Sequence, residues 1–501
     1  MSGGNFVPGP AERVPEPRPD VDWPSIRRVH LMGIGGSAMG NFAGMLAALG
    51  LEVRGSDAGV FDPMKSNLER WSIPYETGYR SENLDWGPDL VVVGNVIRRD
   101  NPEAEAMRAR GLPYASFPEA LGEWLLQGRT PVVVCGTHGK TTTTSLTAVL
   151  LEKCGQQPGL LVGGVPLDLG RSFQRGADGA PFVLEGDEYD TAYYDKRPKF
   201  VHYRPHHAIL TSIEFDHADI YPDFAAVQRA FRLLARLVHP EGLLVAWGED
   251  ERVTAVLEDA RCRVMRYGLV EGTGEAPHLD IYARDVHLGD GGADFELVSG
   301  GSSLGRFRSK IPGLHNVRNT VAALATCLDL GVSADALRAA LASFSGVKKR
   351  QELRGVAAGV SVIDDYAHHP TAVLETVAAI RAAWPDRKLW ALFEAESNTS
   401  RRKVFQSAYV DAFAATGADE VIFCSPLRKA GDTAGDDYLD CDDLVRELGV
   451  RGVSARYLPE VSAIVDTVAA EAGDGDIVLA MSGRDFRGLH GALLEKLAAR
   501  G

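Results

Sequence analysis

The residues best suited to chemistry form one short loop between an apolar run and a stretch with helical spacing: Gly136, Thr137, His138, Gly139, Lys140, Thr141 and Thr142. The backbone N–H groups of such a loop, with the helix N-terminus behind it, bind phosphate oxygens. The lysine would neutralise phosphate charge, and the threonine after it would offer its hydroxyl to Mg²⁺. Because Val134 stands where the usual motif has its first glycine, we interpret the loop as a shortened phosphate-binding variant.

A second glycine cluster fits the pattern GxGxxA and precedes another apolar run, which ends in Ser56 and Asp57. The members of this cluster are Gly33, Gly35, Gly36, Ser37, Ala38 and Met39. In α/β proteins the pattern places a pyrophosphate at a helix N-terminus, although it does not distinguish NAD from another nucleotide diphosphate. A tight strand-to-helix turn with purely structural glycines is the alternative.

Two acidic segments follow the phosphate-binding loop, and each begins where an apolar run ends. The first contains Glu185 and Glu188, and the second contains Glu214 and His217. Both therefore lie at the carboxyl ends of expected strands, where α/β proteins bind ligands. Since Mg²⁺ prefers oxygen ligands, one carboxylate with Thr141 and phosphate oxygens would form its shell. A solvated acidic loop is the alternative for either segment alone.

Two amides and a basic cluster come next along the chain. Asn316 and Asn319 open an expected helix three residues apart and share one face. They would either contact a base edge or cap the helix, and the spacing does not decide between these. The basic cluster of Lys348, Lys349 and Arg350 is typical of a solvated linker when it is considered without its context.

A polar segment follows the first apolar run of the C-terminal part of the chain. Asp365 and Tyr366 lie at the expected carboxyl end of this strand, and His368 and His369 come directly after them. Paired imidazoles could bind a metal, but the sequence offers no third ligand nearby.

Apolar runs alternate with helical segments along most of the chain, which predicts an α/β fold with parallel sheets. Between residues 278 and 310, apolar and polar residues alternate between Gly and Asp turns, which predicts antiparallel hairpins. The pattern restarts near residues 129 and 346. We therefore expect a disordered lead-in and three α/β domains, at 1–25, 26–128, 129–345 and 346–501.

Composition limits the function further. The 501 residues suggest about three domains, and the net charge of −15 argues against general nucleic-acid binding. The apolar runs are shorter than the roughly 18 to 20 residues that span a bilayer, and the N-terminus has no export signal. The six cysteines form no CxxC pair, which is typical of reduced thiols in a cytoplasmic enzyme. The sequence leaves the oligomeric state open.

Taken together, the segments GTHGKTTTT, EGDEYD, EFDHADIYPD, PGLHNVRN and DDYAHHPTAV closely resemble the Mur ligase family of cytoplasmic peptidoglycan synthesis. The resemblance extends over residues 28 to about 495, with the motifs in family order. It implies three α/β domains: an N-terminal Rossmann-like domain that binds UDP, a central P-loop ATPase-type domain, and a C-terminal Rossmann-like domain that binds the acceptor.

The resemblance also implies an activity, with Mg²⁺ as cofactor and ATP as co-substrate. The carboxylate of UDP-N-acetylmuramate would be activated as an acyl phosphate, and an amine would then displace phosphate to form an amide. Three segments, GNVIRRDNPEAEA, YDTAYYDKRPKFVHYRP and FEAESNTSRRKVFQ, resemble the branch of the family that attaches a muropeptide. The branch that attaches L-alanine is the alternative.

Residue roles carry over by motif. Lys140 and Thr141 would hold phosphate and Mg²⁺, and the second metal position would fall on Glu185 and His217. Asn316 and Asn319 would lie by the adenine. Arg350 would reach the γ-phosphate, Asp365 would contact the ribose or the amine, and Tyr366 would belong to the ATP site. Residues 33–39 would bind the UDP pyrophosphate, and residues 56–57 would contact the uridine end.

The chain departs from the family pattern at two places. Some family members bridge metals with a carbamoylated lysine, yet no lysine lies between Lys199 and Lys310. The family pattern also has Pro-Arg where this chain has Ala395 and Glu396, so an acceptor-binding cation is missing there. Candidate substitutes are Arg401, Arg402, Arg484 and Arg487.

Two other classes of function compete with the ligase. An NAD-dependent oxidoreductase would explain the glycine cluster at residues 33–39 but would leave the phosphate-binding loop and both acidic segments without a role. A non-catalytic nucleotide sensor would keep the ATP site without turnover.

Overall fold

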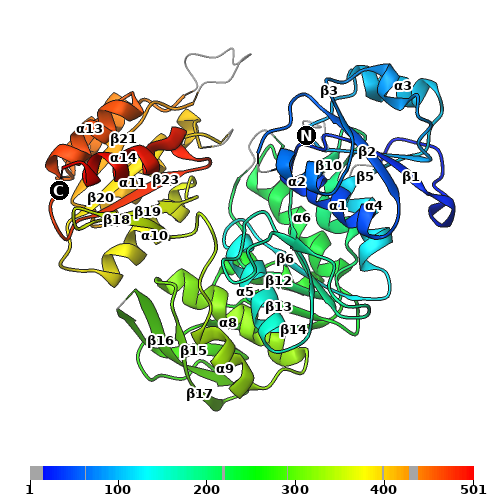
Figure 1. The fold of residues 1–501 in the computed structure, drawn as a ribbon. Helices are drawn as coiled ribbons and strands as arrows, with labels where there is room; N and C mark the ends of the chain where they lie inside the picture. The colour runs from blue at the N-terminus through cyan, green and yellow to red at the C-terminus, as the bar shows by residue number, and fades with distance from the viewer. Residues whose placement is uncertain are drawn as a thin grey trace, which may run out of the picture.

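The structure, a computed structural model, describes residues 15–62, 64–216, 220–289, 291–397, 400–427 and 438–500. Three main sheets lie in succession along the chain, as Figure 1 shows in blue, in cyan to green and in yellow to red. The N-terminal and C-terminal sheets lie on opposite sides of the middle part of the chain. The expected α/β class with three domains and mostly parallel strands is confirmed.

The N-terminal sheet has the order β3-β2-β1-β4-β5, and all its neighbouring strands are parallel. A glycine turn leads from β1 into α1, and Gly33 adopts φ +90°, which only glycine takes without strain. The elements are β1 (Arg28–Met32), α1 (Ser37–Ala48), β2 (Glu52–Asp57), α2 (Met64–Arg70), β3 (Tyr75–Thr77), β4 (Leu90–Val93), α3 (Pro102–Ala109), β5 (Tyr114–Ser116) and α4 (Phe117–Leu121).

The middle sheet has the order β17-β16-β15-β14-β13-β12-β6-β9-β7-β8. Its strand β6 lies between β9 and β12, so the loops that follow these three parallel strands meet at one edge. The strands are β6 (Thr130–Cys135), β7 (Gly159–Leu161), β8 (Phe173–Gln174), β9 (Pro181–Gly186), β12 (His207–Leu210), β13 (Leu243–Trp247), β14 (Arg263–Leu269), β15 (Ile281–Gly289), β16 (Gly292–Ser299) and β17 (Ser302–Ser309).

Helices cover this sheet, and α5 is the most deeply buried of those described, since nearly all its side chains are enclosed. The helices are α5 (Lys140–Lys153), α6 (Phe224–Leu237), α7 (Glu251–Thr254), α8 (Leu314–Asp329) and α9 (Ala334–Ala342). A separate antiparallel ribbon consists of β10 (Asp190–Ala192) and β11 (Asp195–Pro198). The predicted hairpins are confirmed, because β15, β16 and β17 pair antiparallel in succession.

The C-terminal sheet has the order β18-β19-β23-β20-β21-β22, and only its edge strand β18 is antiparallel. Strand β23 therefore lies between β19 and β20. The elements are β18 (Glu352–Ala357), β19 (Val360–Asp365), α10 (Pro370–Ala383), β20 (Leu389–Glu394), α11 (Gln406–Ala415), β21 (Glu420–Phe423), α12 (Cys441–Val450), β22 (Ala455–Tyr457), α13 (Val461–Glu471), β23 (Ile477–Ser482) and α14 (Leu489–Ala498).

The N-terminal lead-in differs in part from its prediction as a disordered segment. Residues 1–14 lie outside the described part of the chain, but the following residues contact the folded protein. The Glu16 N–H donates to the Tyr194 carbonyl at 3.0 Å, and Arg18 pairs with Glu119. In the described part of the chain, no helix is long and apolar enough to cross a membrane.

Candidate functional site

The phosphate-binding loop follows β6 and requires both its glycines. Gly136 and Gly139 have φ values of +131° and +80°, and a Cβ on Gly139 would lie 2.6 Å from Asn319 Oδ1. Ser212, after β12, fixes the loop from the side, since its carbonyl and hydroxyl accept the N–H groups of Thr137 and His138, each at 3.0 Å. The loop therefore has a defined shape, and α5 begins directly behind it without a side-chain cap from the described residues.

Lys140 lies at the centre of this loop and is largely enclosed. Its Nζ donates to the Gly136 carbonyl at 2.6 Å and to Glu188 Oε2 at 2.9 Å. Burial acts to lower the pKa of Lys140, but the carboxylates of Glu188 and Asp187 outweigh it, so the pKa lies above its ordinary value. The side chain is consequently a fixed positive charge at the mouth of the loop, which suits a phosphate ligand.

Thr141 and Glu185 form the oxygen-rich part of the predicted metal site. Both adjoin the same glycine segment: the Gly163 N–H donates to Glu185 Oε1 at 2.8 Å, and a Cβ on Gly164 would meet Thr141 Cγ2 at 2.7 Å. Burial and the nearby Asp187 raise the pKa of Glu185, so the ionised carboxylate lacks part of the compensation that a cation would supply. A hydroxyl and a carboxylate that adjoin the same glycine segment are donors that fit Mg²⁺. His217 lies outside the described residues.

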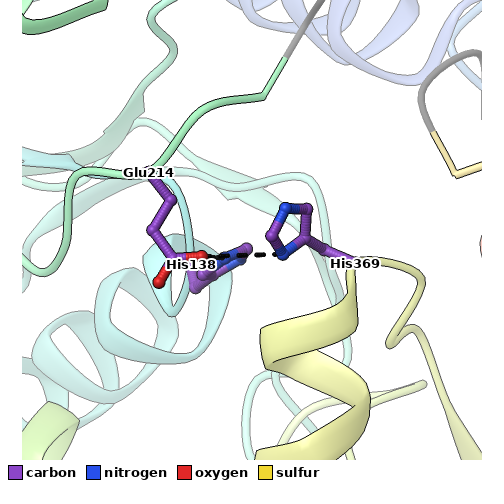
Figure 2. Close-up of side chains that lie close together, drawn as sticks. All are labelled: His138, Glu214 and His369. Carbon is purple, nitrogen blue, oxygen red and sulfur yellow. Dashed lines mark hydrogen bonds and ion pairs between the residues drawn. The ribbon is translucent and has the colours of Figure 1, made fainter. Parts of the chain in front are cut away.

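Two histidines and a glutamate meet where the middle and C-terminal sheets approach each other (Figure 2). His138 comes from the phosphate-binding loop, Glu214 follows β12, and His369 precedes α10. Glu214 Oε2 lies 3.1 Å from His138 Nε2 and 3.6 Å from His369 Nδ1, and it accepts a hydrogen bond of 2.7 Å from Thr371 Oγ1. The three ligand atoms could surround a transition metal, but the Thr371 and His138 contacts already compensate the carboxylate. We interpret the cluster as a polar contact between the two domains.

Acid is expected to weaken this contact. Burial, followed by the nearby His138, lowers the pKa of His369 from 6.5 to about 4. Between these pH values His369 binds a proton in the unfolded chain but not in the folded chain. The free energy of unfolding therefore falls as the pH drops from 6.5 towards 4. At about 1.4 kcal/mol per pH unit, the loss at pH 5 would be about 1–2 kcal/mol. Burial acts to raise the pKa of Glu214, but His138 and Thr371 outweigh it and hold the pKa at about 2, which adds a loss at lower pH.

Urea unfolding at pH 7 and pH 5 measures this effect. The His369→Gln variant should lose less stability than the wild type between the two pH values, because glutamine does not titrate. His287→Gln is the matched control for the loss of one imidazole, since the His287 side chain is 68% exposed and lies outside the cluster. An unchanged pH dependence in His369→Gln would contradict the assignment.

The basic cluster is folded against the site and does not form a free linker. Arg350 Nη2 donates to Thr141 Oγ1 at 3.2 Å, and its guanidinium lies 4.5 Å from the centre of the Tyr366 ring. The carboxylate of Asp365 accepts the N–H groups of Gln351 at 2.8 Å and Ala367 at 2.7 Å. Asp365 therefore holds the turn that carries Arg350, and burial raises the pKa of its carboxyl group.

The two predicted amides lie beside the phosphate-binding loop, at the start of α8. Asn316 Nδ2 donates to the Pro312 carbonyl at 2.7 Å and to Gln351 Oε1 at 3.2 Å, so it contacts the segment that follows the basic cluster. Asn319 packs against Gly139. Neither amide caps α8, which has no side-chain cap at Gly313 among the described residues, and the contacts bring both amides into the group around the loop.

The glycine cluster at residues 33–39 is separate from this group and lies in the N-terminal domain. The Ser56 carbonyl accepts the N–H of Gly33 at 2.8 Å, and Asp57 Oδ2 accepts the N–H of Gly35 at 2.9 Å. The Ser56 hydroxyl is buried and donates to Glu103 Oε1 at 2.7 Å. Ser56 and Asp57 thus shape the glycine turn, and the N-terminus of α1 is open to a ligand because none of the described side chains caps it.

The sequence did not single out three residues of the site. Glu188 was noted as an acidic residue but not as the partner of Lys140, Thr371 was not noted, and Glu214 was not linked to the histidines. Tyr221 supports Glu188 by donating its hydroxyl hydrogen to the Glu188 carbonyl. A signal existed for Glu188 and Glu214, since each lies in one of the two acidic segments, but none existed for Thr371.

Comparison with known protein families matches all three parts of the chain. Residues 28–129 match the Mur ligase family catalytic domain, residues 134–327 the Mur ligase middle domain, and residues 349–484 the Mur ligase glutamate ligase domain. These matches cover the glycine turn, the phosphate-binding loop and the Asp365 segment, respectively.

Individual relatives match over nearly the whole length. The UDP-N-acetylmuramate–L-alanyl-γ-D-glutamyl-meso-2,6-diaminoheptandioate ligase of Escherichia coli strain K12 is 37% identical over 94% of this chain and 99% of its own. The UDP-N-acetylmuramate–L-alanine ligase of Arthrobacter sp. strain FB24 is 38% identical, over 81% of this chain and 83% of its own. The crystal structure of a murein peptide ligase from Psychrobacter arcticus 273-4 superposes with a TM-score of 0.68 at 33% identity, covering 94% of this chain and 98% of that one.

Proposed function

Because this chain belongs to the Mur ligase family, we propose that it is an ATP-dependent amide ligase that joins the tripeptide L-alanyl-γ-D-glutamyl-meso-diaminopimelate to UDP-N-acetylmuramate. The observation that carries this proposal is the near full-length match to the ligase of that name from Escherichia coli. The L-alanine ligase of Arthrobacter has similar identity but leaves a larger part of both chains unmatched. The reaction would serve the reuse of peptidoglycan fragments in the cytoplasm, where ATP is available.

The reaction would proceed in two steps. A carboxylate oxygen of UDP-N-acetylmuramate attacks the γ-phosphorus of ATP, the bond to ADP breaks, and an acyl phosphate forms. The peptide's α-amine then attacks the acyl carbon, phosphate leaves, and the nitrogen loses a proton. Because the first step brings two anions together, fixed positive charges must offset their repulsion.

The cluster around the phosphate-binding loop supplies such charges. We assign the ATP phosphates to the N–H groups of residues 136–142 and to Lys140, whose positive charge is held in place by Glu188. Arg350 donates to the Thr141 hydroxyl and would approach the γ-phosphate. Asn316 and Asn319 would lie towards the adenine, while Asp365 holds the turn that carries Arg350.

Thr141, Glu185 and His217 would hold Mg²⁺, which screens phosphate charge when it is bound. In the N-terminal domain, residues 33–39 would bind the UDP pyrophosphate through the open N-terminus of α1, with residues 56–57 shaping the turn. We accordingly assign UDP-sugar binding to residues 26–128, ATP binding to 129–345 and acceptor binding to 346–501.

The second candidate function is the attachment of L-alanine, which the Arthrobacter relative favours. The chemistry would be the same, with a smaller amine. The absence of turnover would instead favour a nucleotide sensor.

Phosphate release from ATP tests the proposal. With UDP-N-acetylmuramate and Mg²⁺ present, release should depend on the tripeptide and should be slow with L-alanine alone. Release with L-alanine and none with the tripeptide would overturn the assignment of the acceptor. Release that requires neither UDP-N-acetylmuramate nor an amine would contradict the ligase reaction itself.

A further inference from the structure

Two arginine–glutamate pairs lie at the carboxyl edge of the C-terminal sheet, and the ATP site does not use them. Glu394 ends β20 and Glu396 follows it, while Arg484 and Arg487 follow β23 on the neighbouring strand. Arg484 Nε lies 2.8 Å from Glu396 Oε1, and Arg487 Nε lies 2.7 Å from Glu394 Oε1. Four charged groups from two adjacent strands therefore form one cluster, which we call the arginine pair and its carboxylates.

Burial is distributed unequally within this cluster. The side chains of Glu394 and Glu396 are 2% and 8% exposed, whereas those of Arg487 and Arg484 are 34% and 63% exposed. The carboxylates thus lie buried beneath the guanidinium groups, and the surface that a ligand would meet is cationic. Both contacts use the Nε end of the arginine. The terminal nitrogens are the part that binds carboxylates in fork geometry, and among the described residues only Arg487 Nη2 has a further hydrogen bond.

The loop after β23 is shaped to support this arrangement. Ser482 Oγ donates to Glu394 Oε2 at 2.7 Å and accepts the Arg484 N–H at 3.2 Å. Phe486 and Arg487 both adopt left-handed backbone conformations, with φ values of 49° and 50°, which side chains other than glycine rarely take. Such backbone strain persists where the surrounding structure enforces it, and here it sets the direction of Arg487.

Arg487 is also fixed from a third strand, since its Nη2 donates to the Ser425 carbonyl beyond β21 at 2.9 Å. Arg484 has no such contact to its terminal nitrogens among the described residues. Arg487 is therefore held at both ends of its guanidinium group, whereas Arg484 is held at Nε.

The cluster lies on the same edge of the sheet as the reacting groups. Strand β23 separates β20 from β19, and Asp365 at the end of β19 holds the turn that carries Arg350. Two strand spacings amount to about 10 Å. An extended peptide advances about 3.3–3.6 Å per residue, so groups two to three residues from the reacting amine would lie about 7–11 Å away. The spacing between the end of β19 and the end of β20 therefore matches the spacing between the reacting amine and groups two to three residues further along the peptide.

We propose that Arg484 and Arg487 bind a carboxylate of the acceptor peptide, and that Glu394 and Glu396 position the two guanidinium groups. This inference rests on the proposed function. The γ-linked D-glutamate keeps its α-carboxylate, and diaminopimelate adds two more, so the peptide carries anionic groups beyond its reacting end. L-Alanine has no carboxylate at this distance, so the arginine pair would select a peptide over a single amino acid.

Direct binding of a peptide ammonium by the two glutamates is the competing arrangement. It would require exposed carboxylates, whereas both are almost completely enclosed and each already faces a guanidinium group. The arginines, by contrast, reach solvent.

Steady-state kinetics with two acceptors tests the assignment. Arg484→Gln and Arg487→Gln should each raise KM for the tripeptide about tenfold to hundredfold, while kcat and the KM values for ATP and UDP-N-acetylmuramate change little. The same tripeptide with its carboxylates amidated should be a poor acceptor for the wild type, and the variants should use this amidated peptide as well as the wild type does. Arg451→Gln is the matched control, because Arg451 is 45% exposed and pairs with Asp411 in the same domain.

The possible outcomes separate the two proposals. A wild-type enzyme that does not use the tripeptide contradicts the proposed function. An active wild type whose arginine variants keep the tripeptide KM, or lose affinity equally for the amidated peptide, contradicts only the arginine assignment. A larger loss of affinity for the tripeptide in Glu396→Gln than in Arg484→Gln would indicate ammonium binding and would overturn the arginine assignment as well. The wild-type comparison of the two peptides needs no variant, so a folding defect cannot obscure the result.

Discussion

Replacement of Lys140 by alanine is expected to reduce kcat for tripeptide-dependent phosphate release by about a thousandfold or more. The side chain carries a fixed positive charge within the phosphate-binding loop, and Glu188 and the Gly136 carbonyl hold it there. Without it, the γ-phosphate would meet an incoming carboxylate with less charge compensation. The measurement is single-turnover phosphate release at saturating ATP, which separates the chemical step from ATP binding.

Two controls show whether the loss is specific to this position. Lys153 lies at the other end of the same helix and pairs with Asp168, so Lys153→Ala should retain turnover. Cys135→Ala should also remain largely active, because the Cys135 thiol is fully buried and burial raises its pKa. Equal losses in Lys140→Ala and either control would show that the phosphate-binding loop is not the source of the effect.

Replacement of Arg350 by alanine should have the second largest effect, a loss of about a hundredfold to a thousandfold in kcat. Arg350 connects the C-terminal domain to the phosphate-binding loop, since it contacts Thr141 on one side and packs over Tyr366 on the other. Its removal would take away both a cation at the γ-phosphate and the contact of Arg350 with Thr141. The measurement is the rate at which ¹⁸O passes from a labelled UDP-N-acetylmuramate carboxylate to phosphate, because this transfer requires the acyl phosphate to form.

Lys348 provides the matched control for Arg350. It belongs to the same basic cluster, but its side chain is exposed, so Lys348→Ala should leave kcat nearly unchanged. Arg350→Lys should recover only part of the activity, because an ammonium cannot reproduce the planar stacking on Tyr366. If Lys348→Ala and Arg350→Ala behaved alike, the net charge of the cluster rather than the position of Arg350 would be the cause.

The central and longer parts of the fold could be predicted from the sequence. Apolar runs such as Leu389–Glu394 and Ile477–Ser482 are buried on both faces, and uninterrupted hydrophobicity is typical of strands inside a parallel sheet. Short or half-exposed strands escaped notice, as β8 with two residues and β22 with three show. Strands of that length carry too few residues for a periodic pattern, and their pairing depends on neighbours that are distant in sequence.

The candidate site shows the same division. Lys140, Thr141 and Glu185 were predicted because the loop motif and the carboxyl ends of strands are local signals. The contact of His369 with His138 and Glu214 was not, since it depends on how two domains lie against each other. The sequence also gave no partner for Glu396, whereas the structure places Arg484 beside it from another strand. Local patterns thus indicate chemistry, and the pairing of distant charges requires the fold.

The net charge of −15 has a clearer meaning once these pairs are known. ATP, UDP-N-acetylmuramate and the peptide are all anions under the proposed function, so an acidic protein must concentrate its cations locally. Lys140 and Arg350 do so around the phosphate-binding loop, and Arg484 and Arg487 do so on the C-terminal sheet. Raised ionic strength should therefore weaken binding of the peptide more than it would weaken binding to an uncharged site.

The most direct test of the account is a competition between acceptors. Wild-type protein with ATP, Mg²⁺ and UDP-N-acetylmuramate would receive equal concentrations of the tripeptide and L-alanine, and mass spectrometry would identify the product. The account predicts that UDP-N-acetylmuramoyl-tripeptide accounts for most of the product, with one ADP formed per amide bond. A product that carries L-alanine alone would contradict it.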